Sequence, residues 1–129
     1  MNRAVVSAGS NINPWTNMQS ACEIIASQHR LIERSEFILT KPLLYSDQPD
    51  FVNCCLLIQT DLLQTDLQTW LKTVEKRLGR VRNINKNGPR TIDLDIIVWN
   101  GKIINSDYYE RDFVRTATDF LMERITDIN

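Results

Sequence analysis

Apolar residues recur with two different periods along the 129-residue chain, and the change of period predicts where strands give way to helices. Short apolar or alternating runs predict four strands, at residues 3–8, 30–40, 51–60 and 91–99. Apolar residues three and four positions apart predict three helices: one at about 14–28, one carrying a stripe from Leu67 to Leu78, and one at about 116–127.

Turn and capping residues mark the ends of these elements. Asn13-Pro14 suits a helix start, with Asn as the N-cap and Pro in the first turn. Thr65 and Gln68 form the pattern of a capping box, and Gly79 ends that helix. Asn100-Gly101 is a strong hairpin signal and returns the chain through residues 102–105.

The order of strands and helices indicates the fold class. Strand–helix–strand–strand–helix–strand is typical of the ferredoxin-like βαββαβ arrangement. One-sided helices imply an α+β sandwich, in which helices cover an antiparallel sheet and an extra hairpin follows the fourth strand. The length suits a single domain over residues 1–129.

Alternation within the strands separates core positions from candidate site positions. In the third strand one face is wholly apolar, with Val52, Cys54, Leu56 and Ile58, whereas the other begins with Phe51 and Asn53. In the fourth strand Ile92, Leu94, Ile96 and Val98 share an apolar face. The opposite face carries Asp93 and Asp95, about 6.5–7 Å apart along the strand.

Composition excludes several function classes. With 43% hydrophobic and 24% charged residues, the chain is an ordinary globular protein. It has no apolar run near 18 residues and no charged-then-apolar leader, so we expect a cytoplasmic protein without a membrane partner. Its three cysteines are expected to be reduced and to fill core space. A single histidine gives little support for a zinc site or a Ser/His/Asp triad.

Charge is concentrated in one segment although the net charge is only −1. Residues 72–90 hold seven basic residues against the single acid Glu75, so the segment carries +6 and the rest of the chain −7. A solvated helix face accounts for Lys72, Lys76 and Arg77. It does not account for Arg80, Arg82, Lys86 and Arg90, which fall beyond the predicted helix end. Such a local positive field attracts polyanions.

Asp93 and Asp95 next to this basic segment indicate a magnesium–polyphosphate site. Mg²⁺ prefers one or two carboxylates together with phosphate oxygens and water. Arginine forks in the loop suit bidentate phosphate contacts, and phosphoryl transfer needs mainly positioning and charge neutralisation. There is no GxxxxGK[ST] segment, so the chain is not a P-loop protein. Alternatively, the aspartates pair with the arginines and merely order the loop.

Two further alternatives stay open from the residues alone. The basic loop could be a solvated surface loop or a nucleic-acid patch, although aromatic residues for base stacking are absent between Arg80 and Arg90. Phe51 and Asn53 could stack on and hydrogen-bond a flat heterocycle, or could be a partly buried ring beside a satisfied amide.

The segment Lys86-x-Gly88-Pro89-Arg90-x-x-Asp93-Leu94-Asp95-Ile96-Ile97 resembles the signature of the 6-hydroxymethyl-7,8-dihydropterin pyrophosphokinase family of folate biosynthesis. Three other segments match in the family's order and spacing, and the resemblance covers about residues 3–105. They are Gly9-Ser10-Asn11, Asp47-Gln48-Pro49-Asp50-Phe51-x-Asn53 and Glu75-x-x-x-Gly79-Arg80-x-Arg82.

The resemblance implies an enzyme that transfers the terminal diphosphate of ATP to the hydroxymethyl group of the pterin, giving AMP. Asp93 and Asp95 would hold two Mg²⁺ ions and act in catalysis with Arg82 and Arg90. The implied ATP-binding residues are Glu75, Arg80, Arg82, Lys86, Arg90 and Ile96. The implied pterin-binding residues are Thr40, Leu43, Phe51, Asn53 and Phe120. The partners would be these small molecules rather than nucleic acid.

The chain departs from the family pattern near its end, so it resembles a short form diverged at the C-terminus. Asn87 stands where the family usually has tryptophan, and the family's Pro-His pair and later Arg are not found after residue 105. Arg111 and Arg115 are candidates to replace these cations. The second hypothesis is therefore a non-catalytic or altered-substrate relative that binds a pterin or nucleotide.

Overall fold

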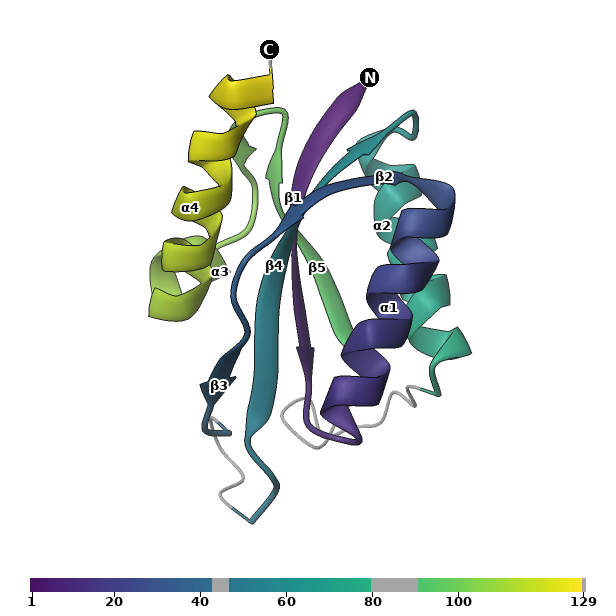
Figure 1. Cartoon of the computed structure of the whole chain (residues 1–129), viewed down its shortest axis with the longest axis vertical. Coiled ribbons are helices and arrows are strands. Elements are labelled where there is room, and N and C mark those ends of the chain that lie inside the picture. Colours follow the sequence, from purple (N-terminus) through teal and green to yellow (C-terminus); the bar gives the residue numbers. More distant parts are fainter. Residues whose placement is uncertain (43–46, 80–90, 129) are drawn as a thin grey trace.

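A computed structural model describes residues 1–42, 47–79 and 91–128, with side chains described up to residue 125, as an α+β protein (Figure 1). In chain order the elements are β1 (Asn2–Ser10), α1 (Pro14–Gln28), β2 (Arg30–Arg34), β3 (Ile38–Thr40), β4 (Phe51–Thr60), α2 (Gln64–Arg77), β5 (Asp93–Trp99), β6 (Lys102–Ile103), α3 (Asp107–Glu110) and α4 (Asp112–Ile128).

The strands form one open sheet in the order β2-β4-β1-β5-β6, with β3 pairing to β4 beyond the end of β2. Each of these pairings is antiparallel. The two longest strands, β1 and β4, pair over the full length of β1, from Asn2 opposite Thr60 to Ser10 opposite Val52. The predicted antiparallel α+β sheet is therefore confirmed.

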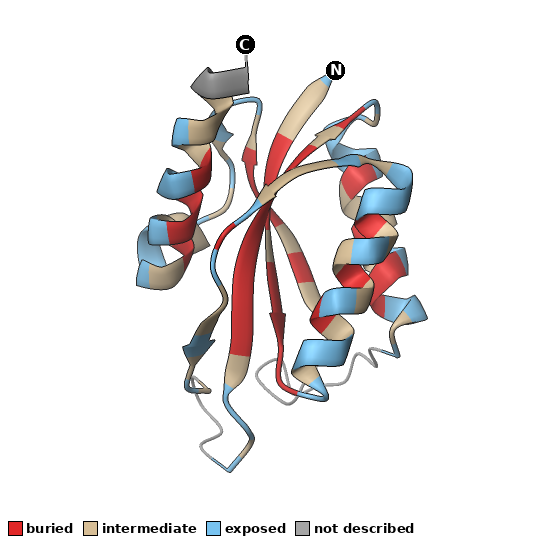
Figure 2. Cartoon of the chain, in the orientation of Figure 1, coloured by how far each residue is buried: buried red, intermediate tan, exposed pale blue. Residues whose placement is uncertain are grey.

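Helices cover both faces of this sheet (Figure 1). On one face α1 and α2 bury a cluster that includes Val6, Leu56 and Leu94. On the other face α4 buries a second cluster that includes Val5, Leu57 and Leu121. The central strands are buried on both sides, as Figure 2 shows, which explains why β4 reads as a nearly continuous apolar run.

The segment predicted as one strand at residues 30–40 is two short strands. Ser35 interrupts it, because its own N–H donates to the Cys55 carbonyl while its Oγ accepts from the Cys55 N–H at 2.8 Å. The side chain thereby replaces a main-chain acceptor at the break. The interruption lets β3 pair with the beginning of β4, next to Asn53 and Phe51.

A bulge in β5 corrects the predicted apolar face of that strand. Val5 and Val6 of β1 pair with Val98 and Ile96, which leaves Ile97 as an extra residue on β5. Ile92, Leu94 and Ile96 lie in the cluster under α1 and α2, as predicted. The assignment of Val98 to this face is wrong, since after the bulge it packs in the cluster under α4.

Helix ends were predicted with mixed success. Asn13 is the N-cap of α1 with Pro14 following, as predicted, although its side chain makes no capping hydrogen bond. The capping box at Thr65 is wrong, because α2 begins at Gln64 and its N-cap is Leu63, two residues before Thr65. The last helix begins at Asp112 rather than near 116, and the short α3 precedes it. No helix in the described parts of the chain is long and apolar enough to cross a membrane.

The hairpin and the cysteine predictions agree with the structure. Asn100 and Gly101 have φ values of 49° and 84°, as a type I′ turn requires, and they join β5 to β6. Cys54 and Cys55 are free and buried, and they lie in the two different clusters on opposite faces of β4. Burial raises the pKa of the Cys55 thiol to about 12, so this cysteine is a neutral packing residue.

The two-sided core predicts that α4 contributes to global stability. Leu121→Ala removes a side chain that is 0% exposed against the sheet, and we expect it to lower the free energy of unfolding by about 2–5 kcal/mol in urea denaturation. Thr116→Ala on the exposed side of the same helix is the control, with an expected change within about 0.5 kcal/mol. Equal effects of the two substitutions would contradict a packed α4 layer.

Candidate active site

A cavity of about 250 Å³ opens on the face of the sheet that α4 covers, beside α3 and the N-terminal turn of α4. Its floor is formed by β1, β4 and β5, and its wall by the two helices. The residues that line it are Ser7, Ala8, Gly9, Thr40, Lys41, Phe51, Asn53, Asp93, Asp95, Asp107, Glu110, Arg111, Phe113 and Val114. The cavity therefore combines acidic, aromatic and amide groups on one sheet face.

Gly9 is fixed at the centre of the floor by its neighbours across the sheet. It pairs with Asn53 of β4 on one side and with Asp93 of β5 on the other. A Cβ on residue 9 would lie 2.9 Å from Asn53 Oδ1 and 3.9 Å from Phe51 Cδ1, so a side chain here would push into the amide. Glycine thus lets the Asn53 side chain lie flat over β1.

Asn53 is held rigidly on the cavity floor. Its Nδ2 donates to the Ile38 carbonyl at 3.1 Å and to Thr40 Oγ1 at 2.8 Å, and both partners belong to β3. Phe51 lies two residues along β4 and lines the same cavity. The sequence pattern was therefore right to place Phe51 and Asn53 on one face. It did not show that β3 orients the amide through Thr40.

Asp93 and Asp95 point to one face of β5, as predicted, and both line the cavity. They pair with Gly9 and Ser7 of β1. Burial, and then the negative charge of Asp93, raise the pKa of the Asp95 carboxyl, while Lys72 opposes the shift. Two carboxylates that repel each other on a half-buried surface are suited to bind a divalent cation, which would favour their ionised forms.

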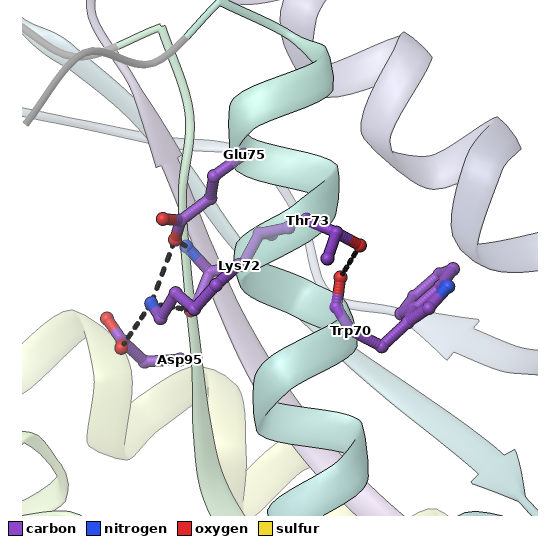
Figure 3. Close-up of polar contacts among 6 residues, drawn as sticks. Trp70, Lys72, Thr73, Glu75 and Asp95 are labelled. Atoms are coloured by element: carbon purple, nitrogen blue, oxygen red, sulfur yellow. Dashed lines mark hydrogen bonds and ion pairs between the residues drawn. The ribbon is translucent and has the colours of Figure 1, made fainter.

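The ammonium group of Lys72 in α2 partly balances the negative charge of Asp95 (Figure 3). Lys72 of α2 places its Nζ 3.3 Å from Asp95 Oδ1, 2.9 Å from Glu75 Oε2 and 2.8 Å from the Leu94 carbonyl. The Leu94 N–H in turn donates to Glu75 Oε2 at 2.8 Å. Among the described residues β6 pairs with Val98 and Trp99, and these two side chains of α2 bond the main chain of β5 at Leu94.

Glu75 and Ile96 were assigned to ATP binding, and both are buried. Glu75 is 1% exposed and bonds to Leu94 and Lys72, so it has a structural role. Ile96 is 3% exposed, and its side chain belongs to the core under α1 and α2. Their contact with a nucleotide stays a prediction. For Ile96 such a contact would have to use the main chain.

Phe120 was assigned to the pterin site, but it is not among the described residues that line the cavity. It is 37% exposed on α4, with the Arg124 guanidinium 4.7 Å from its ring centroid. The ring from this helix that does line the cavity is Phe113. Of the two candidate arginines, Arg111 lines the cavity, whereas Arg115 pairs with Asp112.

Apart from Arg111, the sequence reasoning missed the contribution of residues 107–114. Asp107, Glu110 and Phe113 line the cavity because α3 and the first turn of α4 carry them to it. The predicted helix began near residue 116, which left these residues in a connection. Asp107 and Asp112, each in the first turn of its helix, were available signals for the two helix starts.

Several predicted site residues lie outside the described residues. They are Leu43, Arg80, Arg82, Lys86 and Arg90. Within the described part of the chain there is no group of three or more His, Cys, Asp or Glu side chains placed to hold a metal. A pair of carboxylates fits Mg²⁺, which takes few protein ligands and completes its shell with phosphate oxygens and water.

The chain is similar to known proteins over most of its length. The family model for 7,8-dihydro-6-hydroxymethylpterin-pyrophosphokinase (HPPK) matches residues 5–122. A 2-amino-4-hydroxy-6-hydroxymethyldihydropteridine pyrophosphokinase from Haemophilus influenzae is 36% identical over 122 residues, which cover 86% of this chain and 76% of the relative.

Two longer proteins contain a similar segment. Folic acid synthesis protein FOL1 from Dictyostelium discoideum is 36% identical over 115 residues, and folic acid synthesis protein fol1 from Pneumocystis carinii is 40% identical over 109 residues. Each match covers 82% of this chain but only 17% and 15% of the relative's length. Because the family model matches most of this chain, the chain belongs to the 7,8-dihydro-6-hydroxymethylpterin-pyrophosphokinase family.

Proposed function

We propose that this chain transfers the terminal diphosphate of ATP to the hydroxymethyl group of 6-hydroxymethyl-7,8-dihydropterin and releases AMP, as a step of folate biosynthesis. Its family membership supports the reaction type and ATP as co-substrate. The main structural support is the cavity, in which Asn53 and Phe51 of β4 lie across Gly9 from Asp93 and Asp95 of β5.

The pterin side of the cavity is formed by β3 and β4. A flat heterocycle can stack on the Phe51 ring. The two hydrogen bonds that Asn53 Nδ2 donates to Ile38 and Thr40 fix the amide, and its Oδ1 can accept a hydrogen bond from the heterocycle. Phe113 replaces Phe120 in our proposal as the second ring, since it lines the cavity from the helix side. Two rings facing one slot would exclude water from the pterin and orient its hydroxymethyl group.

The diphosphate side is formed by β5. Asp93 and Asp95 would hold two Mg²⁺ ions, which would neutralise charge on the transferred diphosphate when bound. The carboxylates lie close to the pterin side across Gly9, so the hydroxymethyl oxygen and the diphosphate would meet over β1. Arg111 would contribute a guanidinium from the helix side. The proposed phosphate contacts of Arg80, Arg82, Lys86 and Arg90 and the proposed pterin contact of Leu43 concern residues outside the described ranges.

The strand order also supports a finer fold assignment. With β2 and β3 counted as one strand, the order strand 2–3–1–4 in an antiparallel sheet with α1 and α2 on one face corresponds to a ferredoxin-like βαββαβ unit. The β5–β6 hairpin and α4 would be additions to it. We further propose one domain over residues 1–129, a cytoplasmic location and small-molecule rather than nucleic-acid partners.

The test of the proposed function is formation of AMP from ATP and Mg²⁺ with and without the pterin. AMP and pterin diphosphate that appear only with the pterin would support the enzyme. Binding of ATP or pterin in calorimetry without any turnover would favour a non-catalytic relative, for which the altered region after residue 105 is the motivation.

Asp95→Asn is expected to lower kcat by about a thousandfold, because it removes one of two carboxylates available to a metal. The amide oxygen still accepts a hydrogen bond from Lys72, so the thermal unfolding midpoint should change little. Asp66→Asn, an exposed acid in the first turn of α2, is the control for loss of one negative charge. Wild-type turnover in Asp95→Asn would remove the metal assignment.

Arg111→Gln is expected to lower kcat/KM for ATP by about 10–100-fold, the effect of one charge-assisted phosphate contact. Arg115 lies one turn further on, pairs with Asp112 and is not among the described cavity residues, so Arg115→Gln should stay within about twofold of wild type. Steady-state assays with varied ATP compare the two. Equal losses, or a larger loss for Arg115→Gln, would contradict the proposed role of Arg111.

Phe113→Ala is expected to weaken pterin binding roughly tenfold, because a ring stacked on a heterocycle contributes about 1–3 kcal/mol. Phe120→Ala provides the matched comparison on the same helix, with little expected change in pterin affinity. Calorimetry with the pterin and a non-transferable ATP analogue measures both. A loss confined to Phe120→Ala would restore the assignment made from the sequence.

A further inference from the structure

The ammonium of Lys72 is held in a fixed position behind Asp95. Its three acceptors, Glu75 Oε2, the Leu94 carbonyl and Asp95 Oδ1, match the three N–H donors of an ammonium group. The side chain is only 27% exposed. Figure 3 shows it reaching Asp95 from α2. Asp95 lines the cavity, whereas Lys72 is not among the described residues that line it.

This position gives Lys72 opposite effects on a metal and on a polyphosphate. A divalent cation bound to Asp95 would share that carboxylate with a fixed positive charge and would be repelled by it. The ammonium is partly buried, so water and salt screen this repulsion less than at an open surface. A polyphosphate that arrives with the cation brings several negative charges, which Lys72 attracts.

We propose that Lys72 makes divalent-cation binding at Asp93 and Asp95 conditional on the nucleotide polyphosphate. The inference rests on the proposed function, in which these aspartates hold the metal. Lys72 is here a positioning residue: it occupies one oxygen of Asp95 and keeps the cation affinity of the free protein low. The protein then takes up the metal together with ATP instead of holding it beforehand.

The alternative is that Lys72 only compensates the buried Glu75 and closes the edge of β5. Both roles require hydrogen bonds, but only the proposed role requires a positive charge next to Asp95. Lys72→Gln keeps a hydrogen-bond donor and removes the charge, whereas Lys72→Arg keeps the charge. A purely structural role would alter the unfolding midpoint without altering how strongly ATP promotes cation binding.

The experiment titrates Mn²⁺ into the protein with no nucleotide and with saturating ATP, without the pterin so that no transfer occurs. Because ATP alone also binds Mn²⁺, protein-bound Mn²⁺ is measured by equilibrium dialysis in which both chambers contain the same ATP. Wild-type protein is expected to bind Mn²⁺ much more tightly with ATP than without. Lys72→Gln should bind Mn²⁺ alone about tenfold more tightly than wild type, so the enhancement by ATP falls by about tenfold or more.

Two controls accompany this variant. Lys72→Arg should retain the wild-type enhancement. Lys76→Gln, which removes an exposed positive charge one turn further along α2, should also retain it. If Lys72→Gln does not fold, the double variant Lys72→Gln/Glu75→Gln removes both buried charges and keeps the hydrogen-bonding groups, and the same tighter binding of Mn²⁺ alone is expected.

Failure of this inference differs from failure of the proposed function. Equal or weaker binding of Mn²⁺ alone by the folded Lys72 variants, with ATP-dependent binding intact, would overturn the role of Lys72 only. If wild-type protein binds no Mn²⁺ even with ATP, both the metal assignment to Asp93 and Asp95 and the role of Lys72 are rejected.

Discussion

The N–H and C=O of Leu94 lie at a sheet edge with no neighbouring strand in the described structure. The hydrogen bonds that these two groups make with side chains link the core to the site. Glu75 accepts from the N–H and Lys72 donates to the carbonyl, so two side chains of α2 take the place of a strand. A buried glutamate is costly unless a cation compensates it, which Lys72 does. The same ammonium then reaches Asp95. One hydrogen-bonded cluster therefore links α2, the main chain of β5 at Leu94 and a carboxylate of the site.

The second constraint is the unequal cover of the two sheet faces. Under α1 and α2 the apolar cluster continues through Leu94 of β5 to Ile92, just before that strand, towards the end of the sheet that holds the site. Under α4 it ends at Cys55 and Val114, and beyond them the floor carries Asp95, Gly9 and Asn53. The cavity is thus the part of this face that α4 does not fill. Polar groups can be grouped there because neighbouring core packing on both faces fixes the strands that carry them.

Much of this could be predicted from the sequence because strand alternation is a local property. The faces of β4 and the shared face of Asp93 and Asp95 follow directly from the period of two. The displacement of Val98 could not be predicted in this way. A bulge depends on how β1 pairs with β5, and neither strand alone contains that information. The split between β2 and β3 has a similar origin, since Ser35 breaks the strand through bonds to Cys55, twenty residues away along the chain.

The helix side of the cavity shows a different limit. An apolar stripe identifies a helix only where it meets the core, so the pattern located the part of α4 around Leu121 and missed the turns at residues 107–114. Those turns face a cavity, and their polar residues gave no periodic signal. The assignment of Phe120 to the pterin site came from the resemblance and not from this pattern, and in the structure Phe120 is exposed whereas Phe113 lines the cavity. Residues that line a cavity from the end of a helix escape the hydrophobic pattern, whereas those on a strand are located by its alternation.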